Sequence, residues 1–176
     1  EEDAFVYGFV GRITRDKGID ELFAAYQKLC AEQENTYLML VGRMENEQLL
    51  NQQLLAWAQE NPRVIFCGQS SEVEKYMSAM DVYILPSYRE GFGSAVVEAE
   101  AMGVPVIVSD IPGPTDAMMP EQTGLLVKKA DVDTLYQAMV RICEDRDLCA
   151  ALGRQAAAFA TEKFDQKELV KRILEN

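Results

Sequence analysis

Short apolar runs alternate with longer amphipathic segments along the first three quarters of the chain. The apolar runs are too short for helices, and their continuous hydrophobicity is typical of strands buried on both faces of a sheet. They predict strands at residues 4–10, 37–41, 64–67, 82–85, 106–108 and 123–127. The segments between them repeat apolar residues every three or four positions, which predicts helices at residues 19–32, 45–61, 71–80 and 93–102.

Residues typical of helix ends support several of these boundaries. Ser71 and Glu74 have the spacing of a capping box, in which each side chain bonds a backbone N–H of the other residue. Gly103 stands where a glycine commonly ends a helix. Beyond the sixth strand only helices are predicted, at residues 132–144, 148–161 and 165–174. Asp131 is expected to cap the first of them.

The alternation of strands and helices predicts an α/β fold with a doubly wound, Rossmann-like parallel sheet of about six strands and helices on both faces. The 176 residues correspond to one domain. Ligands of such sheets bind beyond the carboxyl ends of the strands, near the point where the strand order reverses. Candidate functional residues are therefore expected in the loops at residues 11–18, 42–46, 68–71, 86–93 and 110–116.

The charge balance limits the classes of partner. The chain has 29 acidic and 17 basic residues, a net charge of −12. Nucleic acids and anionic membranes need a basic footprint, so neither is expected as the main partner, although a local basic pocket remains possible. The chain contains no histidine, which excludes Ser-His and Cys-His catalysis and His-ligated zinc within it. We expect no metal and no cofactor.

The cysteines and the apolar runs indicate the compartment. Cys30, Cys67, Cys143 and Cys149 include no pair with CxxC spacing, and we interpret them as reduced, partly buried thiols. The chain starts with acidic residues and shows no secretory leader, and no apolar run approaches the ~18 residues of a membrane span. These features predict a soluble, cytoplasmic protein.

Three basic residues gather in the loop after the first predicted strand. Arg12, Arg15 and Lys17 lie between Gly11 and Gly18 in an otherwise acidic chain. A guanidinium fork and an ammonium group together suit a diphosphate, and a glycine lets a ligand approach the backbone. The spacing is neither that of a P-loop nor GxGxxG. A solvated loop with surface bases is the alternative.

The loop after the fourth strand carries glycines and carboxylates at the start of a helix. Gly91 and Gly93 leave backbone amides open at a helix N-terminus, which attracts anions. Ser94 and Glu98 lie one turn apart on one face of this helix, and Glu90 precedes it. The two carboxylates suit sugar hydroxyls. Two alternatives remain. Glu90 would only interact favourably with the helix dipole while Glu98 is solvated, or the two carboxylates would be the acid and base of a glycoside hydrolase.

Taken together, these residues resemble the nucleotide-sugar-dependent retaining glycosyltransferases of the group 1, or family 4, type. The resemblance rests on Gly11-Arg12, on Lys17-Gly18, and on Glu90 and Glu98 separated by seven residues around Gly-Phe-Gly; it extends through 81–87 and 98–107 over essentially the whole chain. That family has the GT-B fold, two Rossmann-like domains facing a cleft. The resemblance implies that residues 1–176 form the C-terminal donor-binding domain, and that an N-terminal acceptor domain is absent from this chain.

The resemblance also implies a role for each matching residue. Arg12 and Lys17 would bind the donor diphosphate and neutralise the charge that develops as it leaves. Glu90 would face the transferred sugar, and Glu98 would bond the ribose hydroxyls. The other residues implied to bind the donor are Gly11 and the residues at the start of the helix, Gly91, Phe92, Gly93 and Ser94. Gln69, which follows Gly68 after the third strand, would contact the nucleotide base. The donor would be a UDP- or GDP-sugar, and the leaving phosphate would take the acceptor's proton.

Two loops depart from the family pattern. After the second strand the family often has a glycine and an acidic residue, whereas this chain has Gly42 followed by Arg43, which either points at the donor or is solvated. The loop at 111–116 contains two prolines and an Asp where the family commonly has a glycine pair followed by a glutamate, so Asp116 is given no role. We expect the isolated chain to bind nucleotide weakly and to transfer no sugar. Any membrane contact would come through the acceptor domain. Residues 165–174 resemble the family's last helix, which crosses back towards that domain. The alternatives are a non-catalytic α/β nucleotide-binding or interaction module and a GT-B epimerase or hydrolase, which the lack of histidine disfavours.

Overall fold

Six parallel strands form a single sheet in the computed structural model, which describes the backbone of residues 3–175 and the side chains of residues 3–163. The strand order is β3-β2-β1-β4-β5-β6, and every pairing is parallel. The strands are β1 (Phe5–Val10), β2 (Thr36–Val41), β3 (Val64–Gly68), β4 (Val82–Leu85), β5 (Val106–Ser109) and β6 (Gly124–Val127). The predicted fold class and all six predicted strands are confirmed.

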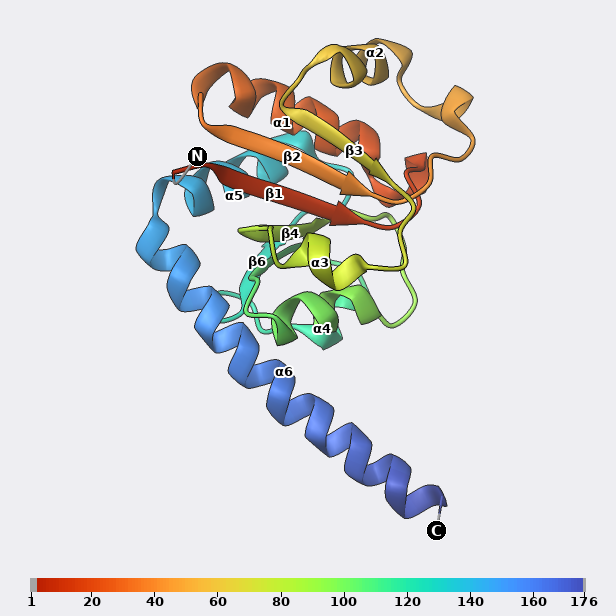
Figure 1. Ribbon diagram of the computed structural model, residues 1–176, viewed down its shortest axis with the longest axis vertical. Helices are drawn as coiled ribbons and strands as arrows, with labels where there is room; N and C mark the ends of the chain where they lie inside the picture. The colour runs from red at the N-terminus through yellow and green to blue at the C-terminus, as the bar shows by residue number, and fades with distance from the viewer. Residues whose placement is uncertain (1–2, 176) are drawn as a thin grey trace.

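Helices cover both faces of this sheet (Figure 1). On one face, α1 (Ile19–Glu32) packs between α2 (Gln52–Glu60) and α5 (Val132–Glu144). On the other face lie α3 (Val73–Met77), α4 (Ser94–Ala101) and the long α6 (Arg146–Glu175), which packs along α4. Three 3-10 turns complete the elements, namely η1 (Arg15–Lys17), η2 (Glu47–Leu49) and η3 (Pro114–Ala117).

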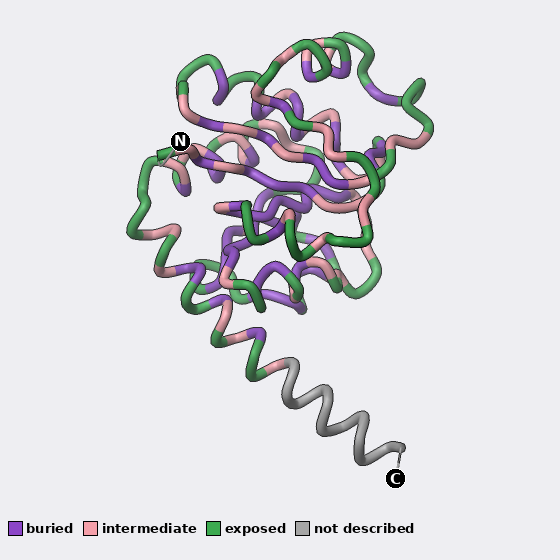
Figure 2. Tube along the Cα trace, in the orientation of Figure 1, coloured by how far each residue is buried: buried purple, intermediate pink, exposed green. Residues whose placement is uncertain are grey.

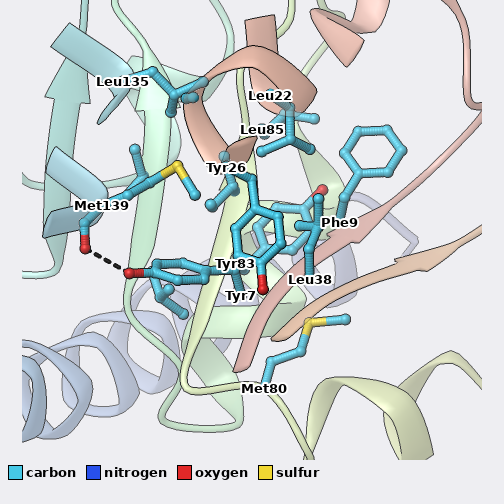
Figure 3. Close-up of a cluster of buried hydrophobic side chains, with 14 of the residues drawn as sticks. Tyr7, Phe9, Leu22, Tyr26, Leu38, Met80, Tyr83, Leu85, Leu135 and Met139 are labelled. Carbon is cyan, nitrogen blue, oxygen red and sulfur yellow. Dashed lines mark hydrogen bonds between the residues drawn. The ribbon is translucent and has the colours of Figure 1, made fainter. Parts of the chain in front are cut away.

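The core consists of the strands and of the helix faces turned towards them (Figure 2). Burial of each large apolar side chain contributes roughly 1.5–3 kcal/mol. Two buried tyrosines cross between elements within this core. Tyr7 in β1 donates a hydrogen bond of 2.7 Å to the Met139 carbonyl in α5 (Figure 3), and Tyr26 in α1 donates one of 2.9 Å to the Thr36 carbonyl. Their hydroxyls are paired because an unpaired buried donor is costly.

Two of the predicted helix ends are confirmed. Gly103 ends α4, with its N–H bonding the Glu100 carbonyl at 2.9 Å, while the Val104 N–H bonds the Ala99 carbonyl at 3.0 Å. These two bonds form a Schellman motif, which satisfies carbonyls that would otherwise be left open at the helix end. Asp131 caps α5 by accepting from the backbone N–H groups of residues 133 and 134.

Two predictions in the first half of the chain are wrong, the capping box at Ser71 and the single helix at residues 45–61. The Ser71–Glu74 capping box does not form, because α3 starts after Glu72 and the Glu72 N–H bonds the side chain of Ser70 instead. The helix predicted at residues 45–61 is divided into η2 and α2. Asn51 restarts the helix there, since its side chain accepts from the Leu54 N–H while its own N–H donates to Asp20 of α1.

The two helices predicted at residues 148–161 and 165–174 are one continuous helix, α6. Residues 162–164 between them include neither glycine nor proline, and the Thr161 hydroxyl bonds the Ala157 carbonyl of the preceding turn at 2.9 Å without ending the helix. The side chains of residues 165–174 lie outside the described part, so their proposed return towards a second domain stays a prediction. Within the described residues, no helix has the length and apolar character to cross a membrane.

Candidate functional site

The strand order reverses between β1 and β4, which are neighbours in the sheet although a long stretch of sequence separates them. The loop after β1 leads to α1 on one face, and the loop after β4 leads to α4 on the other (Figure 1). Because both strands end at the same edge, the loops diverge around a crevice at this point. The two motifs from the sequence fall on these two loops, as predicted.

Lys17 and Glu90 form an ion pair across the crevice. The Lys17 Nζ lies 2.5 Å from the Glu90 Oε1, and the two side chains are only 16% and 13% exposed. The same carboxylate oxygen accepts a hydrogen bond of 2.7 Å from the hydroxyl of Ser87. Sequence reasoning chose Lys17 and Glu90 but missed Ser87. Its signals were its position two residues after the fourth strand and its place in the segment 81–87 that shares the family resemblance.

Backbone contacts fix the two loops against each other. The Tyr88 N–H donates to the Asp16 carbonyl at 2.8 Å, and the Tyr88 hydroxyl donates to the Glu21 carboxylate on α1. Burial, and then the bond to Glu21, raises the pKa of Tyr88 to about 12. Gly18 adopts a φ of 76°, and a Cβ there would lie 2.0 Å from the Pro86 carbonyl oxygen. Any other residue at position 18 would force the loops apart.

A cavity of about 330 Å³ opens beside the Lys17–Glu90 pair, at the N-terminus of α4. Val10, Tyr83 and residues 91–95 are among the residues that line it. The predicted residues Gly91, Phe92, Gly93 and Ser94 therefore all line this one cavity. An ammonium group and a helix N-terminus that meet in one cavity make it suited to an anion.

Arg12 lies in a second cavity, of about 340 Å³, which shares Val10 with the first. Gly11, Gln69 and Arg43 line it as well, so the predicted Gly11 and Gln69 lie beside Arg12. The Arg12 side chain is 59% exposed, and its Nη1 lies 3.6 Å from the Glu45 Oε2. The structure therefore places the two predicted diphosphate ligands, Arg12 and Lys17, in adjoining cavities rather than in one.

Glu98 is exposed on α4 and lines neither of these cavities. Its charge acts on Tyr83, which lines the first cavity: burial raises the pKa of Tyr83, and the charges of Glu90 and Glu98 raise it further. The Tyr83 hydroxyl stays protonated and donates a hydrogen bond of 3.3 Å to the Val10 carbonyl. The charges of the two predicted carboxylates thus both act on one buried tyrosine.

The loop after β5 contacts the loop that lines the first cavity. Gly113 has a φ of 101°, and a Cβ there would lie 2.0 Å from the Gly91 carbonyl oxygen. Further along this loop, the Asp116 carbonyl accepts a hydrogen bond from Lys163 of α6. The Lys163 ammonium also lies 6.0 Å from the centre of the Phe92 ring. Sequence reasoning missed Lys163, because nothing in the pattern of α6 distinguishes it from other surface lysines.

The largest cavity described, about 580 Å³, lies at the opposite edge of the sheet. Phe5, Asp81 and Arg146 line it, and the Arg146 guanidinium lies 4.8 Å from the centre of the Phe5 ring. It contains none of the predicted site residues. In doubly wound folds this edge holds the amino ends of the strands, where ligands seldom bind.

Other chemistry is sparse in the part of the chain that the structure describes. No group of three or more carboxylates or thiols there is arranged to hold a metal ion. The four cysteines are free, with Cys30 buried and the other three half-buried. Burial raises the pKa of Cys67, Cys143 and Cys149, which keeps these thiols protonated and unreactive near neutral pH.

The model of one protein family, described as glycosyl transferases group 1, matches residues 1–159. The chain belongs to this family. As a group 1 glycosyltransferase domain it is 30% identical over 165 residues to the capsular polysaccharide biosynthesis glycosyltransferase CapM of Staphylococcus aureus, covering 94% of this chain and 43% of CapM. The chain thus spans about half the length of the curated relatives it matches.

Solved structures agree with this assignment. HepE from Anabaena in complex with UDP has a TM-score of 0.86 and 26% identity, with 98% of this chain and 48% of HepE covered. The C-terminal domain of the group 1 glycosyltransferase LpcC from Francisella tularensis shares the fold, with a TM-score of 0.83 at 20% identity, over 91% of this chain and 86% of that domain. The predicted GT-B family and its C-terminal, Rossmann-like half are confirmed.

Proposed function

We propose that the chain is the donor-binding domain of a retaining glycosyltransferase, which transfers a sugar from a nucleotide-diphosphate sugar to an acceptor. The Lys17–Glu90 pair at the N-terminus of α4 carries this proposal, because it joins an anion site to a carboxylate suited to sugar hydroxyls. HepE, which binds UDP, supports UDP as the first nucleotide to test. An N-terminal domain of a longer protein would bind the acceptor and make any contact with a membrane.

The diphosphate would lie against Lys17 and the amides at the start of α4. Negative charge grows on the leaving phosphate as the bond to the sugar breaks, and fixed positive groups stabilise that charge. In a cavity shielded from water, removal of one such group commonly costs about 10²–10³ in rate. Lys17 is only 16% exposed, so its charge is weakly screened.

The nucleoside would extend into the second cavity. Gln69 and Gly11 would contact it there, and Glu98 would bond the ribose hydroxyls from α4. Arg12 would turn from Glu45 towards the diphosphate, a small movement for a side chain that is 59% exposed. Arg12 and Lys17 would then approach the diphosphate from its two ends.

Glu90 would face the sugar. In a front-face reaction, the bond from C1 to the diphosphate breaks and the acceptor oxygen bonds C1 on the same face. The departing phosphate oxygen takes the acceptor's proton. This route needs neither a histidine, which the chain lacks, nor a metal or cofactor. The free thiols suit a reducing compartment, and we propose the cytoplasm as the place of the reaction.

Titration of the chain with UDP, GDP and ADP, each with and without a hexose, tests the proposal. We expect one nucleotide to bind, and Lys17→Ala to weaken it at least tenfold, because a charged contact to phosphate is lost. Lys28→Ala is the control, since Lys28 is an exposed lysine on α1 that pairs with Asp133. Binding of none of the nucleotides would instead favour a non-catalytic module, and sugar transfer by the isolated chain would contradict the need for an acceptor domain.

A further inference from the structure

Ser87 is a fully buried polar side chain at the edge of the proposed donor site. Its exposed fraction is 0%, and its hydroxyl donates to the Glu90 Oε1 at 2.7 Å. That oxygen also receives the Lys17 ammonium, so Glu90 is held by two donors on different loops. One donor comes from the loop after β1, and the other from the same loop as Glu90 itself.

We propose that Ser87 is a positioning residue, which keeps Glu90 in place for the donor sugar when the diphosphate engages Lys17. This inference rests on the proposed function. In the structure the ammonium of Lys17 is neutralised by Glu90. A diphosphate carries more negative charge than one carboxylate and competes for the same ammonium. Once Lys17 turns towards the phosphates, Glu90 loses part of its ionic partner.

A carboxylate in a cavity shielded from water does not stay in place without a donor, because burial of an unpaired charge is costly. Glu90 would then rotate towards solvent, away from the sugar. The Ser87 hydroxyl removes that cost in part, since a hydrogen bond to a charged group is stronger than one between neutral groups. Glu90 thus remains oriented in the donor-bound site.

The backbone around Ser87 is rigid enough for this role. Pro86, which is buried, precedes it at the end of β4, and the Pro86 carbonyl contacts Gly18 closely. The next residue, Tyr88, is tied to Asp16 through its N–H. Neither the contact between Pro86 and Gly18 nor the bond between Tyr88 and Asp16 involves a phosphate, so the Ser87 hydroxyl keeps its place whether or not the donor is bound.

A positioning role for Ser87 predicts different effects on the binding of UDP and of UDP-sugars, which a purely structural role does not. Ser87 acts on the sugar through Glu90, whereas UDP without a sugar meets Lys17 and the α4 amides. Loss of the Ser87 hydroxyl should therefore weaken the binding of UDP-hexoses and leave the binding of UDP nearly unchanged. The ratio of the two dissociation constants is the quantity that separates the roles.

The experiment is calorimetric titration of the chain and of Ser87→Ala with UDP, UDP-glucose, UDP-galactose, UDP-N-acetylglucosamine and UDP-N-acetylgalactosamine. For the UDP-sugar that wild type binds best, we expect about tenfold weaker binding in Ser87→Ala, as is typical for loss of a hydrogen bond to a charge. We expect the affinity for UDP to change by less than about twofold. Ser87→Cys keeps the volume with a weaker donor, and we expect it to fall between the two.

Ser109→Ala is the matched control. Ser109 is likewise buried, 1% exposed, at the end of the neighbouring strand β5, but its hydroxyl has no hydrogen-bond partner among the described residues. Its loss should change neither affinity. Equal weakening of UDP and UDP-sugar in Ser87→Ala, or no weakening of either, overturns this inference alone. Failure of wild type to bind any of the five compounds overturns the proposed function and this inference with it.

Discussion

The Lys17 ammonium lies 2.5 Å from a carboxylate oxygen of Glu90, a residue 73 positions further along the chain. The parallel pairing of β1 with β4 brings the two together, because it places the ends of both strands at one edge of the sheet. The ion pair is mostly shielded from water, so it is stronger than a surface pair and costs more to open. A diphosphate that binds Lys17 has to draw it away from Glu90.

Glu90→Gln is therefore expected to tighten the binding of UDP. The amide keeps the shape of the side chain but no longer competes for the Lys17 ammonium, which becomes free for phosphate. We expect about a threefold to tenfold lower dissociation constant by calorimetry, the range that the loss of one competing charged contact allows. In a longer protein that carries an acceptor domain, the same change should abolish sugar transfer.

Glu45→Gln is the control for this gain, since it frees Arg12 from an ion pair that is longer, 3.6 Å, and far more exposed. Exposed pairs contribute about 0–1 kcal/mol, so its effect on UDP binding should be smaller. Weaker UDP binding in Glu90→Gln than in wild type would mean that Glu90 supports the phosphate site instead of competing for it.

The sequence predicts the sheet well because buried parallel strands carry an unmistakable local signal. Continuous apolar runs such as the one that forms β4, buried along its whole length, have few other places in a soluble domain. The placement of Lys17 and Glu90 follows from the same pattern, since the strand order of a doubly wound sheet determines which loops meet.

Contacts between side chains of distant elements carry no such signal. Asn51 restarts a helix inside an amphipathic segment partly because Asp20 of α1 accepts its N–H. Lys163 bonds the loop after β5 only because α6 continues without a break past residue 161. Ser87 is one serine among several until the fold turns its hydroxyl onto Glu90. Each of these depends on tertiary structure, which overrides local propensity.

Gly113→Ala should destabilise the domain and weaken UDP binding. The φ of 101° is unfavourable for alanine, and the added Cβ would lie 2.0 Å from the carbonyl oxygen of Gly91, in the loop of the proposed site. We expect a loss of about 2–3 kcal/mol in the free energy of unfolding, measured by denaturant titration.

Gly91→Ala tests the same contact from the other side. A Cβ at Gly91 meets no atom within 4 Å, and its backbone is not in the left-handed region. It should therefore cost far less stability than Gly113→Ala. Equal losses in the two variants would show that the contact between the loops does not determine the conformation of residue 113.

Glu100 makes the stability of the domain dependent on pH. It is 0% exposed in α4, and burial raises its pKa from 4.5 to about 8, although the bond from Thr123 and the charge of Lys163 lower it. The native state thus binds a proton that the unfolded chain has released. Its contribution to stability is complete below pH 4.5 and is lost as the pH rises towards 8.

Glu100→Gln removes this dependence, because an amide does not titrate. Between pH 5 and pH 9, wild type should lose on the order of 3 kcal/mol more unfolding free energy than the variant. Denaturant titrations at both pH values measure this difference. Glu98→Gln, at an exposed position of the same helix, should leave the pH dependence of wild type nearly unchanged. A wild-type curve parallel to that of Glu100→Gln would show that Glu100 is ionised throughout.

Lys163 connects α6 to two loops of the proposed site, through the Asp116 carbonyl and the Phe92 ring. Lys163→Met keeps the length of the side chain but loses the ammonium, so both loops lose a common anchor. We expect about a twofold to fivefold weaker affinity for UDP and a loss of about 1 kcal/mol in stability, the size of one hydrogen bond. Lys75→Met, which removes a 74% exposed lysine that pairs with the neighbouring Glu72, should affect neither. An affinity that stays unchanged while stability falls would restrict Lys163 to holding α6, and would separate the position of that helix from the shape of the nucleotide site.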